Sequence, residues 1–160
     1  MKKLNNDIIH FFHKQGCVIV STVNQAGAVH NACKGLVEIT SDGKAYLLDL
    51  YHGNTYAHLR TNPNISITAI DEHQFKGYCL QGKARVASVT EVELHLIKSW
   101  EEKMTGRITQ RMLKNISGEK SRLRHPEARL PKPKYLIAID IENVIDLTPL
   151  HLKQEAVSHG

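Results

Sequence analysis

The sequence is poor in cysteine, in aromatic residues and in long hydrophobic runs. Its three cysteines, Cys17, Cys33 and Cys79, lie far apart and form no C-x-x-C pair, which argues against a disulfide framework and against a structural zinc site. Each cysteine falls in a predicted strand, where we expect a buried free thiol. The longest nearly uncharged stretch, residues 16–32, is interrupted by polar residues and glycine, so we predict no membrane span. Residues 1–7 lead into an amphipathic segment and not into an apolar signal core, and we therefore expect a cytoplasmic protein.

Several catalytic signatures are absent as well. The sequence contains no Walker motif, no dinucleotide glycine motif, no H-E-x-x-H pattern and no evident Ser-His-Asp or Cys-His arrangement. Among ten histidines, His10 and His13 stand at i and i+3 on a predicted helix, but a metal site needs a third ligand. We therefore predict no metal site and leave the catalytic residues unassigned. Any chemistry then has to come from a bound cofactor.

The positive charge is concentrated in one segment. Of the 21 Lys and Arg residues, ten lie between residues 103 and 134, where only two glutamates oppose them. A basic segment of this kind indicates an anionic ligand or partner. Three interpretations stay open: a solvated surface, a nucleic-acid patch, or a lid or dimer arm that uses Arg107, Arg111 and Arg122. Nucleic-acid patches often contain aromatic residues for base stacking, and residues 101–134 contain none.

The apolar pattern predicts a mainly β protein with accessory helices, arranged as a β-barrel. Composition, alternation and turn residues predict six strands, at residues 17–23, 28–39, 45–50, 65–70, 78–87 and 135–141. Gly82 is expected to mark a bulge or a close approach of two strands. Helices are predicted at 4–14, 54–61, from the capping box at 90–93, and at 107–116. Six strands joined mostly by short turns favour a closed or partly closed antiparallel barrel.

The chain is long enough for one domain with its own core. We assign residues 1–150 to a single barrel domain with a basic helical and loop insert at about residues 90–134. Residues 151–160 are predicted to form a loose C-terminal tail.

The most informative stretch runs from Asp49 to Pro63. A strand ends there in a glycine turn, and a helix follows, so that free backbone N–H groups offer a seat for a phosphate. Thr55 adds a hydroxyl donor. His52, inside the turn, is a candidate for contact with a ligand, and an ordinary surface position is the equal alternative.

This stretch resembles the phosphate turn of the pyridoxamine 5′-phosphate oxidase-like, FMN-binding split-barrel superfamily, in which a helix ending in Asn-Pro follows a small turn. The Ser21–Val23 strand with Gly27, the Asn31–Gly35 segment, and residues 77–82 are similar to other elements of that family. The match covers about residues 8–88, with 135–142 as the closing strand. The resemblance implies a six-stranded antiparallel Greek-key split barrel of the FMN-binding type, with FMN bound at the interface of a homodimer.

The resemblance also implies the cofactor-binding residues. Lys34 lies where the family places a cation for the FMN phosphate, and Thr55 matches the Thr of its Gly-Lys-Thr turn. Asn54 departs from the pattern, which has Lys or Arg there, and the missing charge costs about 1.5–3 kcal/mol of binding. Each of these residues also has an interpretation that involves no ligand; for Lys34 it is an ordinary exposed lysine on a strand. The predicted set is Thr22, Asn31, Lys34, Asp49, Leu50, Tyr51, Asn54 and Thr55.

The function implied is an FMN-dependent oxidoreductase that acts on a small-molecule substrate or electron donor. Pyridoxamine phosphate oxidase activity itself is disfavoured, because Gly53-Asn54-Thr55 replaces the Ser-Arg-Lys turn and the family's C-terminal Trp and Arg signature is missing. Two alternatives stay open: a non-catalytic flavin or haem carrier, and a nucleic-acid-binding module, which would bind with a steep salt dependence.

Overall fold

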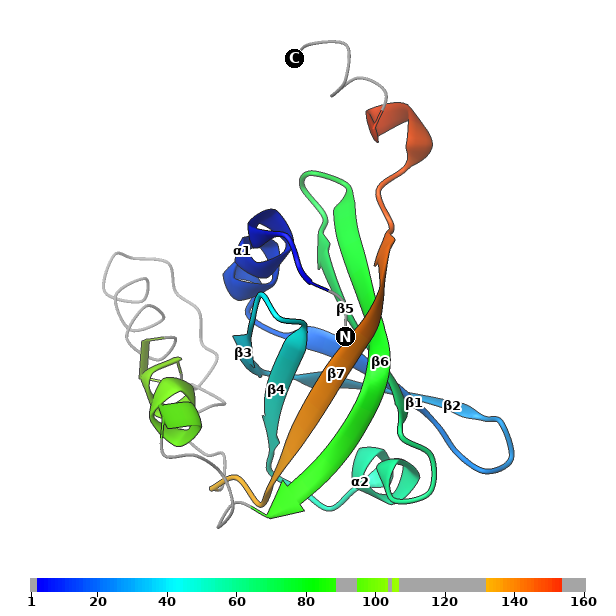
Figure 1. Cartoon of the computed structure of the whole chain (residues 1–160), viewed down its shortest axis with the longest axis vertical. Helices are drawn as coiled ribbons and strands as arrows, with labels where there is room; N and C mark the ends of the chain where they lie inside the picture. The colour runs from blue at the N-terminus through cyan, green and yellow to red at the C-terminus, as the bar shows by residue number, and fades with distance from the viewer. Residues whose placement is uncertain (1–2, 89–94, 104, 107–131, 154–160) are drawn as a thin grey trace, which may run out of the picture.

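One curled antiparallel sheet forms the body of the molecule (Figure 1). The computed structural model describes residues 3–88, 95–103, 105–106 and 132–153. Their strands are β1 (Val18–Val23), β2 (Val29–Lys34), β3 (Leu36–Ile39), β4 (Lys44–Asp49), β5 (Asn64–Asp71), β6 (Lys76–Ser88) and β7 (Tyr135–Asp146). They pair in the order β2-β1-β5-β6-β7-β4-β3. The split-barrel fold predicted from the sequence is confirmed.

The predicted number of strands, six, is wrong, because the described residues contain seven. The single strand predicted over residues 28–39 is interrupted at Gly35 and forms β2 and β3. On one side of this glycine Lys34 pairs with Val18 of β1, and on the other side Leu36 pairs with Leu47 of β4. The chain thus passes from one edge of the sheet to the other. Composition could not reveal this change, because both halves are equally typical of a strand.

Two predicted helices are confirmed as α1 (Asn6–Lys14) and α2 (Asn54–Leu59). Asn5 caps α1 by accepting a hydrogen bond from the backbone N–H of Asp7 at 3.0 Å. Residues 95–103 and 105–106 are helical, as the predicted helix after residue 90 requires. The capping box at 90–93, the helix at 107–116 and the first part of the loop that follows lie outside the described residues. Residues 150–153 form a helical turn where a loose tail is predicted to begin.

The main core lies inside the curl of the sheet, with α1 packed against it. The largest side chains that are almost completely buried there include Phe12, Leu47, Ile67, Ile137 and Ile141. A second, smaller cluster packs the helix at 95–106 against the sheet and contains Val37, Leu48, Leu96 and Leu136. Within the part of the chain that the structure describes, no helix has both the length and the apolar character needed to span a membrane.

Gly82 lies at a bulge in the long β6–β7 pairing, as predicted. The register shifts between Gln81, opposite Asn143, and Gly82, opposite Ile141. A Cβ atom at Gly82 would lie 2.1 Å from the carbonyl oxygen of Asp140. Only glycine therefore permits this approach of the two backbones.

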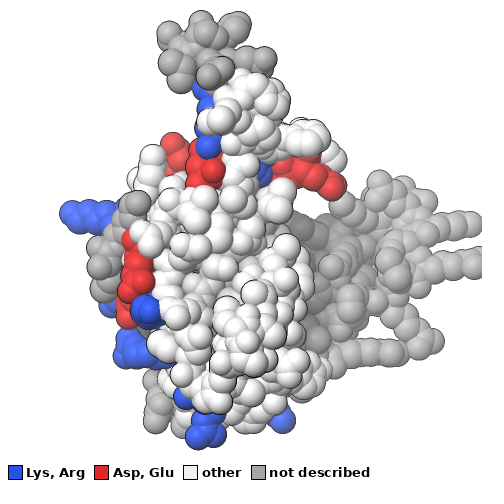
Figure 2. Space-filling model, turned by 90° about the vertical axis from the view of Figure 1, so that its right-hand side faces the viewer, with Lys and Arg blue, Asp and Glu red and all other residues white. Residues whose placement is uncertain are grey.

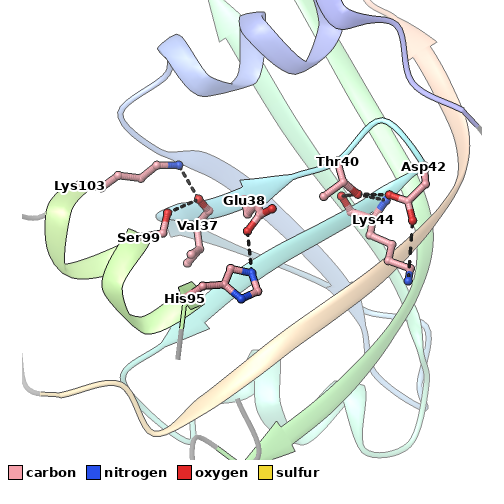
Figure 3. Close-up of polar contacts among 8 residues, drawn as sticks. All are labelled: Val37, Glu38, Thr40, Asp42, Lys44, His95, Ser99 and Lys103. Atoms are coloured by element: carbon pink, nitrogen blue, oxygen red, sulfur yellow. Dashed lines mark hydrogen bonds and ion pairs between the residues drawn. The ribbon is translucent and has the colours of Figure 1, made fainter. Parts of the chain in front are cut away.

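The helix at 95–106 covers the edge of the sheet at β3 (Figure 3). Val37 lies at an irregularity in the β3–β4 pairing. Its carbonyl oxygen accepts hydrogen bonds from the Ser99 hydroxyl at 3.5 Å and from the Lys103 ammonium. His95 lies 3.4 Å from the carboxylate of Glu38. Side chains of the helix thus satisfy an edge that no further described strand pairs with.

The prediction of buried cysteines is wrong for two of the three. Cys17 and Cys33 are exposed, and Cys17 lies just before β1 and not within it. Cys33 is exposed because it belongs to the outward face of the edge strand β2. Its pKa is raised to about 11, first by a hydrogen bond with the Cys17 thiol and then by partial burial. Cys79 is half-buried.

Candidate functional site

A buried polar network joins three strands at one end of the sheet. The Asp49 carboxylate forms an ion pair with the Lys34 ammonium and accepts a hydrogen bond from the Tyr135 hydroxyl at 2.5 Å. Its other oxygen accepts the backbone N–H of Leu50 at 2.8 Å. The side chains of Lys34 and Asp49 are only 11% and 10% exposed. Replacing a buried ion pair by apolar residues is often neutral or stabilising, so this one is a candidate for a functional role.

Sheet pairing positions these groups. Asp49 is the last residue of β4 and stands directly opposite Tyr135, the first residue of β7. Lys34 ends β2 at the far edge of the sheet order, so its ion pair with Asp49 closes the curl from one edge toward the other. Burial, followed by the hydrogen bond to Asp49, raises the pKa of Tyr135 well above its usual range. Tyr135 therefore stays a proton donor to the carboxylate.

An aromatic cluster lies beside this network. The His52 ring is stacked on Tyr135 with centroids 5.4 Å apart and lies 4.3 Å from the Tyr56 ring. Tyr56 in turn meets Tyr135 edge to face at 5.0 Å, and the Arg60 guanidinium lies 5.9 Å from the Tyr56 centroid. The turn after β4 and the helix α2 are thus fixed to the start of β7 by rings. For His52 the sequence left ligand contact and an ordinary surface position as equal alternatives. In the structure its ring packs against the site, and the residue is exposed.

A second cluster, on the inward face of β1 and β2, contacts α2. The Thr22 hydroxyl lies 3.1 Å from Nδ1 of His58, and the His58 ring meets His30 edge to face at 5.7 Å. Thr22 and His30 are direct partners in the β1–β2 register. This histidine cluster (Thr22, His30 and His58) and the aromatic cluster flank α2, which lies across the lower end of the sheet in Figure 1.

The structure brings together some of the predicted site residues and separates others. Lys34, Asp49 and Leu50 share the polar network, and Thr22 is buried in the histidine cluster. Thr55 is only 3% exposed, and its hydroxyl makes no hydrogen bond with any residue that the structure describes.

The remaining three predicted residues lie at the surface. Asn54 is exposed at the start of α2, and Tyr51 is 57% exposed in the preceding turn. Asn31 is exposed and pairs with Ser21, on the face of β2 opposite to that of Lys34. The alternation of a strand therefore separates Asn31 from the polar network.

Tyr135, Tyr56, His30 and His58 are site residues that the sequence reasoning missed. The register places Tyr135 directly opposite Asp49, but nothing in the sequence identifies these two strands as partners. His58 follows the buried Thr55 by three residues and so lies on the same helix face. Within the described ranges no three His, Cys, Asp or Glu side chains gather as a metal site would require.

Comparisons with known proteins agree on the fold. A family model described as pyridoxamine 5′-phosphate oxidase matches residues 5–147. HupZ of Group A Streptococcus matches 91% of this chain and 94% of its own, with 17% identity and a TM-score of 0.62. An FMN-binding protein from Syntrophomonas wolfei subsp. wolfei matches 89% of this chain and 84% of its own, with 15% identity and a TM-score of 0.57.

HutZ, the heme storage protein from Vibrio cholerae, matches 90% of this chain and 94% of its own, with 16% identity and a TM-score of 0.53. At such identities these likenesses show the fold alone. No curated protein sequence matches the chain.

Proposed function

Because the chain belongs to the pyridoxamine 5′-phosphate oxidase family, we propose that it binds FMN at the end of the sheet and works as an FMN-dependent oxidoreductase. The observation that carries this proposal is the buried network of Lys34, Asp49 and Tyr135. It lies where the family resemblance implies a cofactor, and a folding role alone does not explain a buried ion pair at that place.

The chemistry of the donors fits a flavin. The buried Thr55 hydroxyl has no hydrogen-bond partner among the described residues, and such a group in a native protein calls for a ligand or an ordered water. Thr22, Leu50 and Thr55 would contact the polar side chain of the cofactor, and Lys34, paired with Asp49, would lie nearest its phosphate. The rings of Tyr51 and His52 are exposed beside the site and would contact its aromatic part.

In such a site the protein positions the cofactor and need not supply a nucleophile, since FMN itself carries hydride or electrons. The network contributes fixed charges and donors. Tyr135 keeps its proton, because its pKa is raised by burial and by Asp49. The Leu50 N–H and the Lys34 ammonium hold the Asp49 carboxylate in one orientation. The substrate is a small molecule or an electron donor.

Titration of the purified protein with FMN tests the proposal. Binding is expected to quench flavin fluorescence and to raise the melting temperature, and electron donors can then be screened for turnover. Thr55→Val should weaken FMN binding about fivefold, the loss of one neutral hydrogen bond. Thr148→Val, in the segment after β7 and outside the network, is a matched control. If excess FMN causes neither quenching nor a thermal shift, the proposal is wrong.

A non-catalytic haem carrier is the second candidate. The observation that favours it is the pair of half-buried imidazoles, His30 and His58, in a fold that is shared with a heme storage protein. An absorbance spectrum after addition of haem separates the two functions, because haem ligation gives a Soret band. That band should disappear in His30→Ala or His58→Ala if these imidazoles are the ligands.

We also propose that the chain forms a homodimer through the outward face of the sheet. Two rows of paired residues cross five strands of this face without a charged side chain: Cys33, Ile19, Thr68, Cys79 and Ile145, and then Asn31, Ser21, Ser66, Gln81 and Asn143. Outward faces that stay in water normally carry charges. Figure 2 likewise shows a side of the molecule whose middle has few charged residues.

Light scattering of the purified protein tests the dimer. Ser66→Arg introduces a charge in the middle of the uncharged rows and should yield monomers. His73→Arg, in the exposed β5–β6 turn, is the matched control and should stay dimeric. A wild-type protein with the mass of one chain at micromolar concentration would disprove the dimer.

A further inference from the structure

We propose that Asp49 is a specificity-determining residue: it neutralises Lys34, so that the site gains little from the phosphate of FMN and binds riboflavin nearly as well. This inference rests on the proposed flavin site. Lys34 is the cation predicted to bind the phosphate, and in the structure it already forms an ion pair with Asp49.

The arrangement of donors supports the neutralisation. One Asp49 oxygen receives both the Lys34 ammonium and the Tyr135 hydroxyl, and the other receives the backbone N–H of Leu50. Three donors from three segments thus hold the carboxylate, and two of them do not depend on Lys34. The carboxylate therefore keeps its position beside the ammonium when a second anion approaches.

The charge balance works against a phosphate. A phosphate dianion that reaches Lys34 has to share one ammonium with a buried carboxylate, and like charges at such distances repel each other strongly in a partly dry site. The turn before α2 does not compensate, because Asn54 is neutral where the family resemblance implies Lys or Arg. Arg60 follows α2 but lies over the ring of Tyr56.

The hydroxyl-rich side chain and the ring system of a flavin meet no such obstacle. They carry no charge for the Asp49 carboxylate to repel, and Thr22 and Thr55 offer hydroxyl groups as hydrogen-bond partners. The ligand class that this donor set recognises is therefore the uncharged part of a flavin. The phosphate is tolerated and contributes little to affinity.

A double-mutant cycle with two ligands tests the proposal. FMN and riboflavin are titrated by fluorescence quenching into the wild type, Lys34→Met, Asp49→Asn and the double variant. For the wild type, the two dissociation constants should agree within about tenfold. Lys34→Met leaves the Asp49 charge unpaired and should therefore weaken the binding of FMN relative to riboflavin. Asp49→Asn should tighten FMN binding about tenfold to a hundredfold, the worth of one charge-assisted contact, and leave riboflavin unchanged. The gain should vanish in the double variant.

Asp42→Asn provides the matched control, because Asp42 forms an exposed ion pair with Lys44 at 3.8 Å and is not part of the network. Thermal melting verifies that each variant folds. If Asp49→Asn fails to fold, the ratio of the two dissociation constants in the wild type decides alone, since the proposal requires them to agree within about tenfold.

Two results would overturn the inference while leaving the flavin site intact. One is a wild type that prefers FMN by a hundredfold or more and loses this preference in Lys34→Met. The other is an Asp49→Asn variant that binds both flavins more weakly, which would make Asp49 a direct ligand. Absence of binding by either flavin to every variant would instead refute the proposed function.

Discussion

Replacing Gly82 by alanine should destabilise the protein more than any other single methyl group added to a glycine of the sheet. The new Cβ would lie 2.1 Å from the carbonyl oxygen of Asp140 and 3.1 Å from Cα of Ile141. An ordinary contact of this kind needs at least 3.4 Å, so β6 and β7 must separate locally by more than 1 Å. Ladder hydrogen bonds stretched by that amount are lost. Overpacking costs about 1–3 kcal/mol and each lost bond about 1 kcal/mol, and we expect about 3 kcal/mol in total.

Thermal unfolding followed by circular dichroism measures this effect. For a chain of this size, about 3 kcal/mol corresponds to a fall in Tm of roughly 6–12 °C. The Cβ of Gly77→Ala would lie 3.1 Å from the carbonyl oxygen of Ala69, so the Tm of this variant should lie between those of Gly82→Ala and the wild type. Gly16→Ala is the matched control, because its Cβ would meet nothing within 4 Å. If Gly82→Ala has the same Tm as the Gly16→Ala control, the reasoning about the bulge is refuted.

Three further substitutions test other features. Tyr135→Phe keeps the ring and removes one of three donors to the buried carboxylate, so chemical denaturation should show a loss of about 1–2 kcal/mol. The pKa of His13 is lowered from 6.5, first by burial and then by Lys103; the folded state therefore binds protons less readily than the unfolded chain. Stability should fall as the pH drops below about 6.5, and Tm should depend less on pH in His13→Asn. Phe75 has a φ of 48° and is 70% exposed, so Phe75→Gly should relieve strain and raise the free energy of unfolding by about 1 kcal/mol.

Each of these expectations has its own control. Tyr51→Phe, at an exposed hydroxyl, should leave stability unchanged, and a Tyr135→Phe protein as stable as the wild type would show that the hydroxyl contributes nothing. His73→Asn, in an exposed turn, should keep the wild-type dependence of Tm on pH. If His13→Asn keeps it as well, the lowered pKa of His13 has no effect on folding. A Phe75→Gly protein less stable than Phe75→Ala would contradict the claim of backbone strain.

Local signals were sufficient for most of the fold. Alternation and β-branched residues predicted the strands, and Gly82 predicted the bulge that the structure contains. The short turns expected between strands are present at residues 24–27 and 41–44, where Gly27 and Gly43 both have positive φ. These features depend on a few neighbouring residues, which a sequence displays directly.

What the sequence could not reveal depends on partners distant along the chain. Gly35 separates two strands that lie at opposite edges of the sheet, and only the pairing partners make that division visible. Lys34 and Asp49 are both predicted to contact a cofactor, but nothing in the sequence shows that their charges pair with each other. The Tyr135 hydroxyl reaches Asp49 through strand pairing between residues 86 positions apart, and the ion pair of Lys34 with Asp49 forms because the sheet curls. The sequence therefore predicts Lys34 and Asp49 one by one, and the structure shows that they form one polar network with Tyr135.

The helix that covers β3 has a consequence for the behaviour of the protein in solution. An exposed sheet edge is a template on which other chains can add strands and aggregate. Ser99 and Lys103 occupy the Val37 carbonyl at that edge. Detachment of this helix, by mutation or by partial unfolding, would expose the edge while the barrel itself is still folded. Aggregation would then begin from a nearly native molecule and not from an unfolded one, and a hydrophobic substitution at Lys103, which removes a donor to the Val37 carbonyl, would promote it.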